Sequence, residues 1–185
     1  MDQIPRHNEV TEDDASTFEF MRKGLLMTMS KVGVLCLSAT PFEILMCSHY
    51  ADNHRGFCIE FDFRDDSRLR QLARPVRYQE NMPSMGAKEL AANSENSFVD
   101  TCILTKARQW EYEQEWRVFQ HEGNKSVSAP SEITAIIFGA RMPLSERMMF
   151  REAIKHKPNI QLKEAGLCED RFAVEIHEST SRIES

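Results

Sequence analysis

Two short segments hold most of the residue types that could perform chemistry. The first, residues 46–56, places two histidines, a serine, a tyrosine, an aspartate and an arginine within eleven positions. This density is typical of a ligand-facing helix end and turn, and it makes Ser48, His49, Tyr50 and Arg55 candidate site residues. Ser48 and His49 cannot form a hydrolase pair by themselves, because neighbouring residues on a helix point to different faces. The alternative is a helix end whose polar groups satisfy only backbone and turn hydrogen bonds.

The second segment, residues 106–117, contains the only two tryptophans of the chain and the pattern E-x-E. On an extended backbone Glu113 and Glu115 share one face of a strand, about 7 Å apart. Trp116 then faces the core, and Arg117 returns to the acidic face. A glutamate among aromatic side chains can have a raised pKa or can stabilise a developing cation. The alternative, which composition slightly favours, is a partly exposed edge strand with an ordinary ladder of Glu and Arg charges.

Other kinds of site fail on spacing. The chain has no Walker loop, no glycine-rich dinucleotide fingerprint and no H-E-x-x-H motif. A third hypothesis, a metal-dependent nuclease, would hold a divalent ion on Glu113, Glu115 and Asp62. Sequence alone cannot bring carboxylates of separate strands together, so we expect no metal.

Composition limits the class of protein. The 185 residues suffice for one domain with a core, and the net charge of −6 argues against broad binding to nucleic acid or to an anionic membrane. Residues 1–14 are polar and lack the apolar region of a signal peptide. No apolar run approaches the roughly 18 residues that a membrane span needs. We therefore expect a cytoplasmic protein that makes no membrane contact.

The five cysteines are an odd number and form no C-x-x-C pair. They stand at positions 36, 47, 58, 102 and 168. Four of them have apolar neighbours, which predicts buried, reduced thiols and no metal site.

The elements that must position the two segments are short strands separated by helices of varied length. Periodicity predicts a helix from Ser16 or Thr17, with Phe18, Met21, Leu25 and Met29 on one face. It predicts a second helix from Pro41, with Phe42, Leu45, Met46 and His49 on one face. Further helices are predicted from an Asp66 cap to Leu72, over 87–108 and over 143–156. Strands are predicted at 32–37 (buried), 57–63, 75–78, 115–120, 133–138, 160–163 and 171–176, with a turn at 52–56. This pattern predicts one α+β domain over 16–178, with a mixed, mainly antiparallel sheet and flanking helices. Residues 1–15 are expected to be a flexible lead and 179–185 a frayed end.

In their order and spacing the two segments resemble one bacterial family, catalogued as domain of unknown function 2971. Its members carry a stretch like M-W-S-H-Y-A-D-N-H-x-G-F-C-I-x-F, and residues 46–61 here read MCSHYADNHRGFCIEF. The family continues with V-x-Y, matched at 76–78, and with K-x-x-x-W-x-Y-E-x-E-W-R, matched at 106–117. The resemblance covers about residues 32–139. Its clear departure is Cys47, where the family usually has Trp.

The family pattern is similar to that of the ADP-ribosyltransferase superfamily, whose enzymes bind NAD in a cleft between two small sheets. That resemblance implies transfer of ADP-ribose from NAD to an unknown acceptor, in phage defence or toxin activity. Glu115 would hold the nicotinamide-ribose 2′-hydroxyl, Glu113 would orient the acceptor, and His49 or Tyr50 would line the nicotinamide pocket. The further candidates for contact with NAD are Ser48, Arg55, Lys106, Trp110, Tyr112 and Arg117.

The resemblance has a gap at its N-terminal side. Family members usually begin with a Y-K-Y-R-like strand and an N-D-P-F-like turn, and neither occurs here. One subclass of the transferases also uses an arginine on an early strand. The resemblance therefore implies a truncated member, for which the alternative function is a non-catalytic module that binds a nucleotide or a protein.

Overall fold

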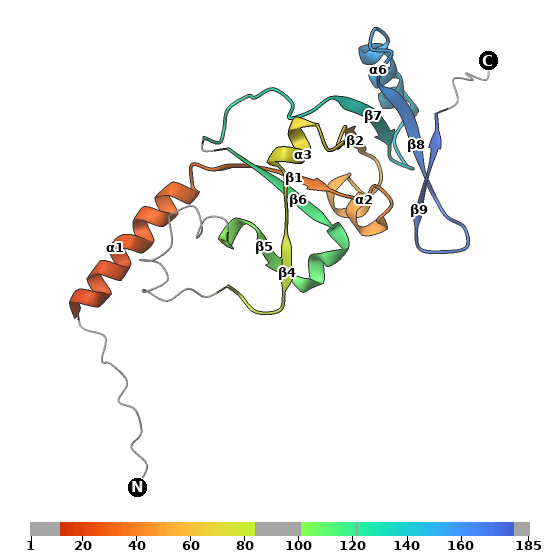
Figure 1. The fold of residues 1–185 in the computed structure, drawn as a ribbon. Helices are drawn as coiled ribbons and strands as arrows, with labels where there is room; N and C mark the ends of the chain where they lie inside the picture. The colour runs from red at the N-terminus through yellow and green to blue at the C-terminus, as the bar shows by residue number, and fades with distance from the viewer. Residues whose placement is uncertain (1–11, 84–100, 121, 180–185) are drawn as a thin grey trace, which may run out of the picture.

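In the computed structural model, the strands of the described residues form two sheets and one short ribbon (Figure 1). The structure describes residues 12–83, 101–120 and 122–179. The first sheet has the order β1-β6-β3, with β1 (Gly33–Ser38), β6 (Glu115–Gln120) and β3 (Arg74–Pro75) in antiparallel pairs. The second has the order β2-β7-β8-β9, with β2 (Phe57–Phe61), β7 (Ile133–Phe138), β8 (Gln161–Leu167) and β9 (Val174–Glu178). Only its β7–β8 pair is parallel, and β4 (Arg77–Gln79) forms a parallel ribbon with β5 (Thr105–Ala107).

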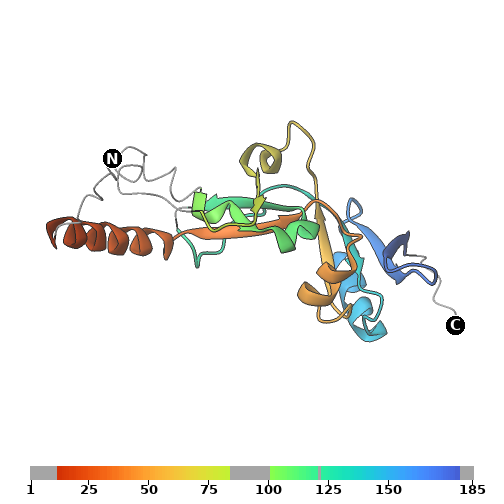
Figure 2. The same ribbon diagram turned by 90° about the horizontal axis from the view of Figure 1, so that it is seen from below.

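Helices are interspersed among these strands. They are α1 (Glu12–Met29), α2 (Ile44–Tyr50), α3 (Arg68–Leu72), the 3₁₀ helix η1 (Arg108–Glu113) and α6 (Leu144–Ile154). In both ribbon views α1 extends away from the first sheet (Figures 1 and 2). The second sheet lies on the other side of the first sheet from α1. The predicted α+β class, with mixed and mainly antiparallel sheets, is confirmed. No helix of the described residues combines the length and the apolar character that crossing a membrane requires.

The first sheet packs α3 on one face. Leu69 and Ala73 at α3 form a buried cluster with Val118 of β6, and Leu37, Phe61 and Trp116 pack against it. Trp116 therefore faces the core, as its place in the strand predicts. Burial of such side chains is the main source of stability here, at roughly 25 cal/mol per Å² of apolar surface.

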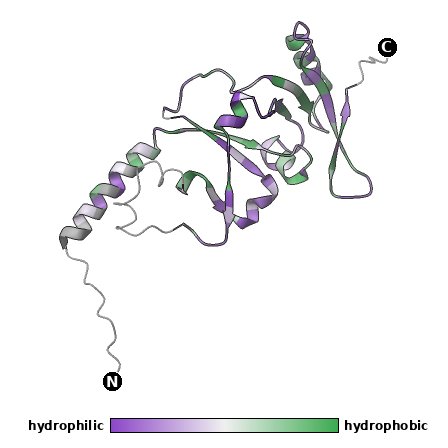
Figure 3. Cartoon of the chain, in the orientation of Figure 1, coloured by the Kyte–Doolittle hydropathy of each residue, from purple (hydrophilic) through white to green (hydrophobic). Residues whose placement is uncertain are grey.

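The second sheet packs α6 on one face. Ile136, Phe138 and Met142 form its buried cluster, and Phe150 of α6 packs against it. The hydrophobic colouring that runs along β7 in Figure 3 matches this role, because β7 has the sequence ITAIIF. Ala135 to Phe138 are all buried.

A left-handed turn joins α2 to β2 and is hydrogen-bonded to the segment that follows β7. Asp52, Asn53 and His54 have φ of 44°, 52° and 69°, and this confirms the predicted turn. Asn and Asp tolerate positive φ better than most residues do. The carbonyl of His54 accepts a hydrogen bond from the Arg141 amide at 2.9 Å, so the position of α2 depends on β7.

Several predicted helix starts are wrong. α2 begins at Ile44 and not at Pro41, because the Glu43 carboxylate accepts from the Leu45 amide and caps the helix. Phe42 lies outside α2 and is exposed. α3 is capped by the Ser67 hydroxyl, which accepts from the Arg70 amide at 3.1 Å, and not by Asp66. α1 begins at Glu12, ahead of Ser16 and Thr17.

The helix predicted over 87–108 is wrong at its end. Residues 101–103 are helical, but Thr105–Ala107 form β5, because pairing with β4 outweighs local helix propensity. Residues 84–100 lie outside the described part. The predicted 57–63 strand ends at Phe61, after a register shift at Glu60. The last two strands run further than predicted, to Leu167 and Glu178.

Two predictions of burial are also wrong. β1 is not a buried strand, because Val34, Leu35 and Cys36 are exposed. None of the five cysteines is buried: Cys36 and Cys58 are exposed, and the other three are half-buried. All five are free thiols. Apolar neighbours in the sequence do not bury a residue when no other element packs over its strand.

Candidate functional site

The two glutamates of the E-x-E pattern do not share one extended strand. Glu113 ends η1, Gln114 takes a left-handed conformation with φ of 45°, and Glu115 begins β6. Both glutamates are nevertheless buried, with exposed fractions of 2% and 6%. The edge-strand interpretation is wrong as well, because β6 lies between β1 and β3.

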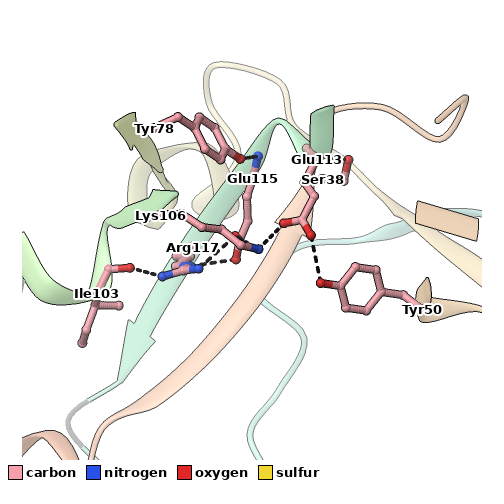
Figure 4. A network of polar contacts seen from close by, with 8 residues as sticks. All are labelled: Ser38, Tyr50, Tyr78, Ile103, Lys106, Glu113, Glu115 and Arg117. Atoms are coloured by element: carbon pink, nitrogen blue, oxygen red, sulfur yellow. Dashed lines mark hydrogen bonds and ion pairs between the residues drawn. The ribbon is translucent and has the colours of Figure 1, made fainter. Parts of the chain in front are cut away.

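Two cations neutralise the two buried carboxylates (Figure 4). The Lys106 ammonium bridges them, contacting Glu113 Oε2 and lying 3.0 Å from Glu115 Oε2. Arg117 binds Glu115 as a fork, with Nε 2.7 Å from Oε1 and Nη2 2.9 Å from Oε2. Its Nη1 also donates to the carbonyl of Ile103. Bidentate pairs of this kind are among the strongest charge-assisted hydrogen bonds in proteins.

The pKa values of this network follow from burial and pairing. Burial raises the pKa of Glu115, but hydrogen bonds from Arg117, Cys36 and Lys106 outweigh it and bring the pKa to about 2. Burial lowers the pKa of Lys106, yet its bonds to the two glutamates raise it above the ordinary value. Although Cys36 as a residue is exposed, its thiol is partly withdrawn from water against Glu115, and this desolvation, together with the bond to that carboxylate, raises the pKa of the thiol to about 11. Glu115 is therefore a carboxylate and Cys36 a neutral thiol at neutral pH.

Backbone hydrogen bonds hold the E-x-E segment in place. The Glu115 amide donates to the Tyr78 hydroxyl at 2.7 Å, and the Ser38 hydroxyl donates to the Glu113 carbonyl at 2.7 Å. The Ala39 amide donates to the Gln114 carbonyl at 3.1 Å. Neither Ser38 nor Tyr78 is among the site residues predicted from the sequence. The V-x-Y pattern contained a signal for Tyr78, whereas nothing in the sequence pointed to Ser38.

The first segment meets the second at Glu113. The Tyr50 hydroxyl donates to Glu113 Oε1 at 2.9 Å, although 64% of the surface of Tyr50 is exposed. The ring centroids of His49 and Trp110 lie 6.1 Å apart in an edge-on arrangement, and those of Trp110 and Tyr112 lie 6.0 Å apart. Two segments about sixty residues apart in the chain thus form one cluster of aromatic rings beside a buried acid–base network.

Residues 46–118 match the family "Protein of unknown function (DUF2971)". The predicted resemblance is confirmed over this DUF2971 segment, which begins inside α2 and ends in β6. It contains both chemistry-bearing segments, together with Tyr78. No curated protein and no solved structure matches the chain.

Two predicted residues of the DUF2971 segment lie apart from the glutamates. Ser48 is half-buried and Arg55 is exposed, and in the described part of the chain no hydrogen bond or ion pair joins either to the acidic pair. The carboxylate of Asp62 binds Arg64, at 2.9 and 3.1 Å. Because all three carboxylates of the nuclease hypothesis are engaged by cations of the chain itself, that hypothesis loses its support. Over the described ranges no three His, Cys, Asp or Glu side chains are grouped to hold a metal ion.

The low pKa of Glu115 makes stability depend on acid pH. Because its pKa is lowered from 4.5 to about 2 on folding, Glu115 stabilises the fold fully above pH 4.5. That stabilisation is lost as the pH falls from 4.5 to about 2. The expected loss is on the order of 2 kcal/mol, measured by urea unfolding between pH 6 and pH 2.

Two variants distinguish the contribution of Glu115 to the pH dependence of stability from that of the other acidic residues of the DUF2971 segment. Glu115→Gln removes the titrating group, so we expect a flatter dependence on pH in this window. Glu111→Gln, whose side chain is exposed, serves as the control and keeps the wild-type profile. Equal acid sensitivity in Glu115→Gln and the wild-type protein would show that the titration belongs to other groups.

Proposed function

We propose that the DUF2971 segment binds a nucleotide of the NAD class, with a ribose hydroxyl on Glu113 and a planar ring beside Trp110. The observation that carries this proposal is the hydrogen bond from Tyr50 to Glu113. Among the described residues, Oε1 of Glu113 receives a side-chain bond only from this neutral hydroxyl, which belongs to a largely exposed residue. A ribose hydroxyl is a donor of the same type and can replace it without any loss in the number of hydrogen bonds.

The geometry supports Glu113, more than Glu115, as the residue that holds the ribose. Both oxygens of Glu115 are engaged by Arg117, and one also by Lys106. Displacing these charged donors would leave a buried carboxylate without a partner, at a cost of several kcal/mol. Displacing the Tyr50 hydroxyl breaks one hydrogen bond to a carboxylate, about 1.5–3 kcal/mol, and the incoming ribose hydroxyl restores a bond of the same kind.

The aromatic residues supply the second half of the proposed site. Trp110 and His49 are exposed and Tyr112 is half-buried, so their rings are within reach of a ligand. Stacking of a base on an aromatic side chain contributes about 1–3 kcal/mol. A nicotinamide or adenine ring on Trp110 and a ribose hydroxyl on Glu113 would together orient one nucleoside.

The reaction that such a site would support is transfer of ADP-ribose. The bond between C1′ of the ribose and the nicotinamide nitrogen breaks, and nicotinamide leaves with the bonding electrons. A nucleophile of the acceptor then bonds to C1′ and loses its proton. Glu113, beside the ribose, would stabilise the cationic sugar between these steps.

A second candidate function is a non-catalytic nucleotide-binding module. The observation that favours it is charge balance: Lys106 and Arg117 already neutralise Glu113 and Glu115. A carboxylate whose charge is compensated stabilises a developing cation less than a free one does. Binding would then occur without breakage of the glycosidic bond.

Nucleotide binding is tested by calorimetry and thermal unfolding with NAD, ADP-ribose and nicotinamide. We expect NAD and ADP-ribose to raise the Tm, because a ligand that binds only the folded state stabilises it. Tyr50→Phe removes the hydroxyl that competes for Glu113, so NAD should bind at least about 10-fold more tightly. Glu113→Gln, with its fold checked by circular dichroism, should bind NAD more weakly, and Glu111→Gln, which changes an exposed carboxylate, is the matched control. The absence of any Tm shift, or weaker binding by Tyr50→Phe, would contradict the proposal.

The two candidate functions differ in what becomes of NAD. Incubation with labelled NAD and a cell extract should yield free nicotinamide and labelled acceptor if the chain is a transferase. Binding without loss of NAD would support the non-catalytic module. Glu113→Gln should abolish label transfer if Glu113 acts on the ribose.

A further inference from the structure

The second sheet has one face that α6 does not cover. Side chains alternate along a strand, so the face opposite Ile136 and Phe138 carries Ile137. The strand register extends this face to Lys163 of β8 and from there to Glu178 of β9. This face is therefore separate from the core under α6, and no residue of the Glu113 network lines the cavity found on it.

A cavity of about 390 Å³ lies on this open face. Its apolar walls are Ile137 and Ile176 from the sheet, with Pro41 and Phe42 from the loop that precedes α2. The carbonyl of Phe42 accepts a hydrogen bond from the Val174 amide at 3.4 Å, which ties this loop to β9. The volume falls within the range of roughly 300–1,000 Å³ that is usual for small-molecule sites.

The charged groups in the cavity wall do not balance. Oε2 of Glu60 accepts from Lys163 at 2.8 Å, and its Oε1 accepts from Thr134 at 2.7 Å, so Glu60 is fully satisfied. Glu178 stands opposite Lys163 in the strand register, yet none of the ion pairs found among the described residues includes Glu178. The cavity wall thus holds two carboxylates, Glu60 and Glu178, against the one ammonium group of Lys163.

We infer that this cavity binds a small organic amine, with its ammonium group on Glu178 and its apolar body against Ile137, Ile176 and Phe42. Apolar walls with a few placed polar groups are the usual make-up of a small-molecule site. A cation supplies the charge that the wall lacks. An anion would meet Glu178 and would have to separate Lys163 from Glu60. The inference does not depend on nucleotide binding at Glu113.

Three probes of one size test the charge preference. They are phenethylamine, 2-phenylethanol and phenylacetate, titrated separately into the ¹⁵N-labelled protein and followed by amide chemical shifts. We expect phenethylamine to bind most tightly, 2-phenylethanol more weakly and phenylacetate weakest, with shifts centred on β8 and β9. Equal affinities for the three probes, a preference for phenylacetate, or no binding of phenethylamine at millimolar concentration would overturn the inference.

Variants then separate the ammonium contact from the apolar one. Glu178→Gln should weaken phenethylamine about 5-fold and leave 2-phenylethanol unchanged, since an exposed ion pair contributes up to about 1 kcal/mol. Ile176→Ala should weaken both probes. Glu152→Gln, which changes an exposed carboxylate on α6, is the matched control and should change neither. An unchanged phenethylamine affinity in Glu178→Gln would rule out the proposed ammonium site.

Discussion

Replacing Arg117 with methionine is expected to destabilise the protein by about 3–5 kcal/mol, the usual cost of breaking a buried ion pair. Methionine retains the apolar stem but removes both hydrogen bonds of the fork to Glu115. Among the described residues, Glu115, only 6% exposed, then keeps Lys106 as its one cation. The carbonyl of Ile103 also loses its donor from Arg117. The loss is measured by urea unfolding at pH 7, followed by tryptophan fluorescence.

Arg108→Met is the matched control for this change. Arg108 also pairs with two acids, Glu80 at 3.5 Å and Glu111 at 4.0 Å, but its side chain is exposed. Exposed pairs contribute at most about 1 kcal/mol, so this variant should remain close to the wild-type protein. Similar losses in the two arginine variants would show that burial of the Glu115 network does not decide stability.

Gly139→Ala is expected to destabilise the protein by at least about 3 kcal/mol, because the new methyl group has no space. A Cβ at this position would lie 2.2 Å from the His54 carbonyl oxygen and 2.7 Å from that of Gly56. Both obstacles are backbone atoms and cannot rotate away. Relief would break the hydrogen bond from the Gly139 amide to Gly56 and that from the Arg141 amide to His54, both 2.9 Å long.

The same substitution should reach the proposed site through the turn. Residues 52–54 follow α2 directly, so displacing them shifts Tyr50 away from Glu113. We therefore expect weaker NAD binding together with the loss of stability. Gly24→Ala is the control: apart from the adjacent residues and the backbone of its own helix, no atom of the described residues lies within 4 Å of a Cβ built there, and alanine in mid-helix should stabilise α1 by about 0.5–1 kcal/mol. A Gly139→Ala protein as stable as the wild type would mean that this close approach is not rigid.

The pattern of apolar residues in the sequence predicted the two strands that contribute most to the core, β6 and β7. β6 and β7 have the predicted bounds, 115–120 and 133–138, because apolar periodicity directly reflects which side of a strand is covered. The core position of Trp116 follows from the same alternation. The pattern failed for β5, because a three-residue strand depends on its partner β4 more than on its own sequence.

Sequence alone determined which two segments carry the reactive side chains and which family they match. It also predicted that Arg117 returns to the side of Glu115, since that depends only on alternation along one strand. Only the tertiary structure decided that both carboxylates are buried, that Lys106 bridges them, and that Tyr50 reaches Glu113 across 63 residues of chain. The physical reason is range: periodicity is a local property of the chain, whereas the pairing of charges depends on contacts that form only when β6 is enclosed between β1 and β3.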